Sequence, residues 1–151
     1  MPTISRENEK KLKINFKEKS SYLGKYKNGE KTGLGIQKWE DNTVYIGYFL
    51  NNRANSWGKF MHSDGDEYLG EFKDDRACGY GIYKQPNGAI YEGIWQKDSQ
   101  DGVGEEIWTD KAKYLGSYSR GKKDGYGTYI WPNNSVYEGE WKENYLHGYV
   151  K

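Results

Sequence analysis

The chain lacks most of the features that place a protein in a familiar class. It has a single cysteine, Cys78, which excludes an internal disulfide framework and favours a reducing compartment. No apolar run approaches the roughly 18 residues of a membrane span, and residues 1–21 lack the apolar stretch of a signal peptide. A net charge of +1 lacks the basic excess of a nucleic-acid-binding protein. We therefore expect a soluble intracellular protein that binds no nucleic acid.

Aliphatic side chains are also scarce, whereas aromatic residues and glycine are abundant. The mean hydropathy of -1.11 and the 30% of charged residues are by themselves typical of disordered chains. Aromatic residues nevertheless make up 17% of the chain, and 20 of its 151 residues are glycine. Because disordered segments contain few aromatic residues, the composition predicts a folded protein whose core is built from rings.

A motif of tyrosine, any residue, glycine, any residue and an aromatic residue recurs at a constant interval of 23 residues. When each unit is numbered from its tyrosine, position 3 is always glycine, and every glycine of the chain falls on one of five recurrent positions. Self-similarity at a fixed period is the signature of a repeat architecture. We expect units at 22–44, 45–67, 68–90, 91–113, 114–136 and, incomplete, 137–151.

The conserved positions of the unit predict two strands and two turns. Position 8 holds only glycine, asparagine or aspartate, the residues that tolerate a left-handed backbone, so it marks a turn. Positions 20 and 21 carry pairs such as Asp64-Gly65 and Asn87-Gly88, which are typical of tight turns. Strands are expected at positions 1 to 6 and about 12 to 18. Their alternation places rings of one strand over glycines of the next, a device that fixes register.

This pattern predicts an all-β fold, namely an elongated, twisted, single-layer antiparallel sheet of consecutive β-hairpins. The pattern also resembles the MORN repeat, most clearly where Tyr114-Leu-Gly-Ser-Tyr-Ser-Arg-Gly-Lys-Lys-Asp-Gly-Tyr-Gly-Thr-Tyr-Ile-Trp-Pro-Asn-Asn-Ser-Val runs into Tyr137. The resemblance covers residues 22–151 and implies the same fold. It implies less about function, because such arrays occur in axonemal proteins, protist scaffolds, junctional membrane proteins, plant lipid kinases and a histone methyltransferase.

The two ends of the array depart from the unit. Residues 1–21 form a leader, and Leu12, Ile14 and Phe16 project onto positions 14, 16 and 18, so we expect a capping half-unit at about 12–16. The sixth unit stops at Lys151 inside its second strand. An open strand edge there favours pairing with another chain, or else the chain continues in a longer protein.

No arrangement of residues predicts catalysis, a cofactor or a metal site. The two histidines, His62 and His147, fall at different unit positions, and Cys78 lies beside a turn. The acidic run at 64–67 is not a calcium loop, because Leu69 stands where such a loop requires glycine. The glycine pairs at positions 12 and 14 recur on strands instead of preceding one helix, which argues against a phosphate-binding loop. We therefore expect a protein that is not an enzyme.

The rings at positions 1 and 5 are the candidate binding site. One interpretation is that they form the thin core over the glycines. The other is that a single layer leaves a stripe of rings open, on the order of 50 to 60 Å long, as a groove for a partner polypeptide. The stripe comprises Tyr22, Tyr26, Tyr45, Phe49, Tyr68, Phe72, Tyr91, Trp95, Tyr114, Tyr118, Tyr137 and Trp141.

A second candidate surface is basic and would serve a membrane-association module that binds anionic phospholipids. Acidic residues interleave with it, which favours a merely solvated rim. It comprises Lys111, Lys113, Arg120, Lys122 and Lys123, with Lys10, Lys11 and Lys13 near the N-terminus.

We therefore expect a non-enzymatic scaffold that binds a partner polypeptide through the aromatic groove and the sheet edges, within a multi-subunit assembly. The resemblance implies a cytoplasmic, cytoskeletal setting such as the ciliary axoneme. The alternatives are the membrane-association module and the regulatory array of a larger enzyme such as a lipid kinase or methyltransferase.

Overall fold

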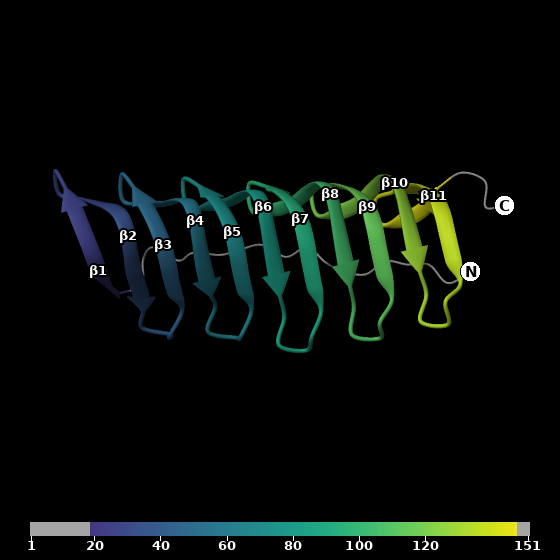
Figure 1. Cartoon of the computed structure of the whole chain (residues 1–151), viewed down its shortest axis with the longest axis horizontal. Coiled ribbons are helices and arrows are strands. Elements are labelled where there is room, and N and C mark those ends of the chain that lie inside the picture. The colour runs from purple at the N-terminus through teal and green to yellow at the C-terminus, as the bar shows by residue number, and fades with distance from the viewer. Residues whose placement is uncertain (1–18, 148–151) are drawn as a thin grey trace.

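A computed structural model describes residues 19–147 of the chain, which form one antiparallel sheet of twelve strands. Every strand pairs with its neighbours in sequence, so the order in space is the order along the chain. Figure 1 shows the resulting elongated, twisted ribbon. The strands are β1 (Ser20–Lys27), β2 (Glu30–Trp39), β3 (Val44–Leu50), β4 (Arg53–Met61), β5 (Glu67–Lys73), β6 (Arg76–Lys84), β7 (Ile90–Gln96), β8 (Ser99–Ile107), β9 (Lys113–Ser119), β10 (Lys122–Ile130), β11 (Val136–Lys142) and β12 (Tyr145–His147).

The two predicted turns of each unit are confirmed and have different geometries. Within a unit, both central residues of the turn have positive φ, as in Asp74 (48°) and Asp75 (69°), which is the signature of a type I′ hairpin turn. Between units, the side chain at position 20 caps the loop: Asp41 Oδ1 accepts a hydrogen bond from the Thr43 N–H at 2.9 Å. The same bond recurs at Asp64, Asn87, Asp110 and Asn133.

The second strand of units 1 to 5 is longer than expected, because it contains a β-bulge that the sequence did not reveal. In β4, Gly58 pairs with Gly47 and Ala54 with Phe49, so the three residues 55–57 oppose the single residue Tyr48. At the centre of this bulge, position 12 adopts φ between 67° and 102° in units 1 to 5, which is why it is almost always glycine. The bulge bends the strand, and the ribbon curls over along its upper edge (Figure 1).

The predicted packing of rings over bare backbone is also confirmed. A Cβ atom added to Gly104 would lie 2.5 Å from Cε2 and Oη of Tyr91, so only glycine fits beneath that ring. Gly104 pairs with Gly93 on one side and Gly116 on the other, which places three glycines side by side across the sheet. Backbone without side chains therefore forms the floor on which each position-1 tyrosine lies.

The rings also contact one another in a continuous zigzag along the ribbon. Tyr91 meets Trp95 of its own unit at a centroid distance of 5.2 Å and Tyr118 of the next unit at 5.2 Å, both nearly perpendicular. Equivalent edge-to-face contacts link the position-1 and position-5 rings from unit 1 to unit 6. Such pairs add about 0.5–1.5 kcal/mol each beyond burial.

Hydrogen bonds between hairpin turns connect successive units a second time. The Asp75 N–H donates to the Ala54 carbonyl at 3.0 Å, and the Ala54 N–H donates to Asp75 Oδ1 at 2.7 Å. Asp98 makes the same two bonds to Ala77, and Asn144 makes them to Lys123. Each turn is thereby fixed to the bulged strand of the unit before it.

Two sequence expectations concern residues that the structure does not describe. The capping half-unit at about 12–16 and the end of the chain at 148–151 both lie outside the described residues. Within residues 19–147, there is no helix long and apolar enough to cross a membrane.

Candidate functional site

The twelve rings predicted to line a groove are mostly sealed inside the curled ribbon. Ten of them are at most 5% exposed; only Tyr22, which is half-buried, and Tyr26, which is 60% exposed, differ. The expected open stripe is therefore corrected to a closed aromatic core, with rings accessible only beside β1. The physical reason is the bulge, which bends each second strand and lets rings of adjacent units cover one another.

The hydroxyl groups of the position-1 tyrosines serve the fold. Each donates a hydrogen bond to the carbonyl three residues later, as Tyr91 does to Ile94 at 2.9 Å. The bond recurs at Tyr22, Tyr45, Tyr68, Tyr114 and Tyr137. Burial raises the pKa of the Tyr45, Tyr68, Tyr91 and Tyr114 hydroxyls far above the ordinary value, so they remain protonated donors at physiological pH.

One predicted lipid contact, Lys123, is fully buried and is corrected. Its ammonium group lies 4.7 Å from the centre of the Trp108 ring and 5.5 Å from that of Tyr114, a cation–π arrangement inside the core. Lys123 occupies unit position 10, where the bulged strand points inward and where earlier units carry Ala54 and Ala77. Alanine in two of the other units is a partial signal that this side chain faces the interior, since units 1 and 4 carry Lys31 and Gln100 there.

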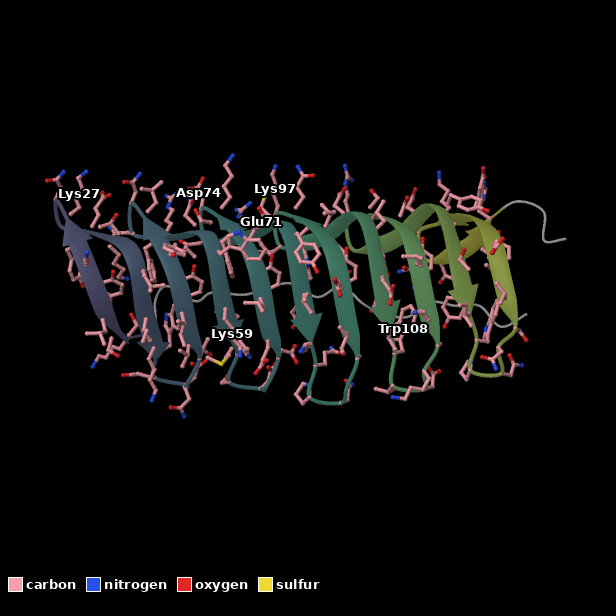
Figure 2. The ribbon with its side chains drawn as sticks, viewed as in Figure 1. Lys27, Lys59, Glu71, Asp74, Lys97 and Trp108 are labelled. Atoms are coloured by element: carbon pink, nitrogen blue, oxygen red, sulfur yellow. The ribbon has the colours of Figure 1, made fainter. Side chains whose placement is uncertain are left out.

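Lys10, Lys11 and Lys13 lie outside the described residues, and the remaining predicted basic residues that the structure describes do not gather into one patch. Lys111 and Lys113 lie where β9 begins, whereas Arg120 and Lys122 lie at the hairpin turn after its other end. A strand of seven residues, at about 3.3 Å each, separates the two pairs by roughly 20 Å. Lys113 also forms an ion pair with Glu105 at 3.4 Å. The polar side chains instead spread along both edges of the ribbon, as Lys27, Asp74 and Lys97 do at its upper edge (Figure 2).

The face opposite the rings, called here the outer face, carries the accessible apolar side chains. Cross-strand pairing joins eleven of its residues into one continuous row across β1 to β11. This outer row consists of Leu23, Ile36, Ile46, Lys59, Leu69, Ile82, Glu92, Glu105, Leu115, Thr128 and Glu138. All eleven side chains are exposed or half-buried. The row is apolar over β1–β6, except at Lys59, and mainly acidic over β7–β11.

A second line of side chains on the outer face does not share this division, because it stays apolar on β7, β8 and β10, where Ile94 is 41%, Val103 61% and Tyr126 63% exposed. Leu34 (63% exposed) pairs directly with Tyr48 (48% exposed) between β2 and β3. Trp57 is 48% exposed, and its ring centre lies 6.5 Å from that of Tyr80. Lys59 and Glu71, labelled in Figure 2, are charged side chains on two of the same strands, β4 and β5. The apolar surface is therefore at least two side chains wide over the first half of the sheet.

Sequence reasoning missed the outer face as a candidate site. Strand alternation already assigned positions 1, 3 and 5 to one side, and the same rule assigns positions 2 and 4 to the other. Leu23, Ile46, Leu69 and Leu115 all stand at position 2 and are between 39% and 74% exposed. Aliphatic residues recurring at a solvent-facing position were the available signal.

The described residues contain no group of three side chains suited to holding a metal ion. His62 Nδ1 lies 2.9 Å from Asp64 Oδ1 beside the loop between β4 and β5. Cys78 is half-buried in the bulge of β6. His62 and Cys78 therefore lie at a loop and a bulge of the repeating unit and are not brought together in one site.

Comparison with known proteins gives one family and a fold likeness. The profile of the MORN repeat matches residues 22–44, 68–90, 91–113, 114–136 and 137–149. No curated protein matches the chain. Among solved structures, the chain is similar to the TCP domain of SAS-4 from Drosophila melanogaster, solved in complex with a proline-rich motif of Ana2. The two are 15% identical, the alignment covers 91% of this chain and 88% of that one, and the TM-score is 0.44.

Proposed function

Because the chain belongs to the MORN-repeat family, we propose that it is a non-enzymatic scaffold that holds a partner polypeptide within a larger assembly. The observation that carries this proposal is the division of the sheet into a buried aromatic face and an exposed face whose row of cross-strand neighbours is apolar over β1–β6 except at Lys59. Contiguous apolar surface that a folded protein leaves open is typical of interaction sites.

The construction of the ribbon supports a role as a rail for docking. Every unit is fixed to the next by strand pairing, by ring contacts and by turn hydrogen bonds. A surface mounted on such a frame loses little conformational freedom when a partner binds, which favours affinity. The setting we propose is a cytoplasmic cytoskeletal assembly, with the ciliary axoneme as the first place to look; this part rests on the family alone.

Membrane association is the less favoured function, because its candidate residues are dispersed. Lys123 is buried, and the other four basic residues lie at the two ends of β9. A membrane-binding surface requires several cations on one face.

Crosslinking mass spectrometry on the native protein in cell extract tests the proposed function. A lysine-reactive reagent would report on Lys27, Lys59, Lys73 and Lys97, which are distributed along the ribbon. We expect a recurrent polypeptide neighbour joined through several of these positions. Recovery of only intramolecular crosslinks, from extract in which the protein is abundant, would argue against a scaffold.

A further inference from the structure

We propose that the outer face binds a polypeptide segment that presents apolar side chains to β1–β6 and lysine or arginine side chains to β7–β11. This inference rests on the proposed function, because it names the face and the chemistry of the partner. It places the partner on the side of the sheet that faces away from the ring core.

The outer row is long enough to bind an extended segment whose apolar and charged residues follow one another in a defined order. Eleven strands at about 4.8 Å spacing give a line of roughly 48 Å. The first half is apolar except at Lys59, and three of the last five residues are glutamate. A partner lying along this row therefore meets two different surfaces in sequence.

The apolar half is open to a degree that the fold does not explain. Leu23 is 74% exposed, Leu34 63%, Leu69 49% and Ile46 39%, and all lie on β1, β2, β3 or β5. Isolated exposed leucines are ordinary, but here Leu23 and Ile46 both pair with Ile36, and Leu34 pairs with Tyr48, so exposed apolar side chains adjoin one another. Covering them would remove adjacent apolar area from water, which makes this half the source of affinity.

The acidic half carries like charge that one lysine compensates only in part. Glu92 and Glu105 are directly opposed between β7 and β8, and like charges in that position destabilise a sheet. Lys113 forms an ion pair with Glu105, and the Tyr80 hydroxyl donates to Glu92, so the carboxylate of Glu92 has a neutral partner and not a cation in its described hydrogen bond. Glu138 and Glu140 extend the acidic surface across β11. Cations from a partner would relieve this repulsion.

The same distribution disfavours two other occupants. An anionic membrane would be repelled by the acidic half. A second copy placed along the row would oppose acidic side chains to acidic ones in one direction and to apolar ones in the other. A segment whose apolar end is followed by basic residues satisfies both halves at once.

The test is fluorescence anisotropy with a labelled 16-residue probe peptide, in which leucine alternates with serine in the first half and lysine with serine in the second. The proteins compared are the full chain, I46S/L69S, E92Q/E105Q and, as controls, Lys97→Gln and Asp74→Asn. Lys97 and Asp74 both stand at hairpin turns, away from the outer row. Circular dichroism establishes that each variant keeps its sheet.

We expect I46S/L69S to weaken binding by about tenfold or more and E92Q/E105Q by several-fold, with a reduced dependence on salt. The controls should match the unmodified chain. A peptide with glutamate in place of lysine should bind several-fold less tightly. The inference would be overturned if the two peptides bind equally or if neither double variant changes binding. It would also be overturned if the protein prefers phosphatidylserine vesicles in a salt-sensitive way, or if sedimentation shows a dimer that buries the apolar surface.

The proposed scaffold function does not depend on the outer face being the binding surface. If crosslinking identifies a polypeptide neighbour while I46S/L69S leaves its capture unchanged, the protein is a scaffold that uses another surface. If no neighbour is found and the peptide does not bind, both proposals fall together.

Discussion

The two faces of this sheet obey different rules. On the inner face, tyrosine at position 1 and glycine at position 3 recur in all six units, and an aromatic residue follows at position 5 every time. On the outer face, position 2 is leucine or isoleucine in four units and glutamate in the other two. The inner face is constrained by contacts that leave no room for another residue, whereas the outer face makes only scattered contacts within the chain, such as the ion pair of Lys113 with Glu105.

This contrast separates what the fold requires from what a partner selects. Rings that contact the next unit every 23 residues must repeat, because one gap interrupts the packing of two units. Residues of the outer row contact solvent, so their order along the ribbon is available to encode a binding preference. Mutations on the two faces should accordingly differ in what they change.

Tyr91→Ala should have the largest effect, with a loss of about 4 kcal/mol in the free energy of unfolding. The ring is fully buried, lies over Gly104 and contacts both Trp95 and Tyr118. Leu69→Ala on the outer face is the counterpart and should cost less than about 0.5 kcal/mol. Urea denaturation followed by circular dichroism measures both. Similar losses for the two variants would remove the distinction between the faces.

Gly104→Ala sharpens the same comparison by adding one carbon atom instead of removing a ring. The methyl group would overlap the Tyr91 ring, and we expect a loss of about 3 kcal/mol. Gly88→Asn is the matched control, since Asn42 and Asn134 occupy the equivalent loop position with φ near 70°. The control should lower the midpoint of thermal unfolding only slightly. If the Gly104→Ala variant unfolds at the same temperature as the unmodified chain, the Tyr91 ring does not constrain the backbone at this position.

Ser56→Gly tests the one described bulge whose central residue is not glycine. Ser56 stands at the bulge with φ of 67°, where the equivalent residues of units 1, 3, 4 and 5 are glycine. A left-handed backbone costs a residue with a Cβ atom about 1 kcal/mol, so the substitution should stabilise the protein by up to that amount. The readout is the midpoint of urea unfolding. A decrease in stability would indicate that the serine side chain makes a contact worth more than the strain.

The smallest predicted effect concerns the turn aspartates. Burial raises the pKa of the Asp75 and Asp98 carboxyl groups above the ordinary value. A raised folded-state pKa means that the folded protein holds these protons more tightly, so their contribution to stability falls as pH rises from the ordinary aspartate pKa through the folded value.

Replacing Asp75 and Asp98 by asparagine keeps the Oδ1 acceptor, as Asn52 and Asn144 show in other units. We expect a gain of about 0.5 kcal/mol at neutral pH and a flatter dependence of stability on pH just above the ordinary aspartate range. Urea unfolding from pH 3 to 8 makes the measurement. A steeper profile in the double variant would reverse the assigned sign.

The repeating elements of the fold could be predicted from the sequence. The 23-residue interval places β3, β5, β7, β9 and β11 within a residue of the predicted first strands, and the residues at position 8 lie in the predicted turns. The reason is that each of these features depends on neighbours within one unit. Glycine beneath tyrosine and left-handed residues in a two-residue turn are local requirements with few chemical solutions.

The curvature of the ribbon could not be predicted in the same way. Glycine at position 12 fits an ordinary strand under a ring as well as a bulge, and only the pairing of Gly47 with Gly58 and Phe49 with Ala54 distinguishes them. That bend decides that Lys123 points inward and that the ring stripe closes. The accessible surface thus depends on a backbone geometry shared between strands, which residue types alone do not specify.

The sequential strand order also determines how the ribbon would respond to force. Its inter-strand hydrogen bonds run along the long axis, and each strand is held only by the one before and the one after. Tension applied between the two ends of the described sheet would therefore load these bonds in series and peel strands away singly. A ribbon built this way yields gradually under load and releases its length one strand at a time.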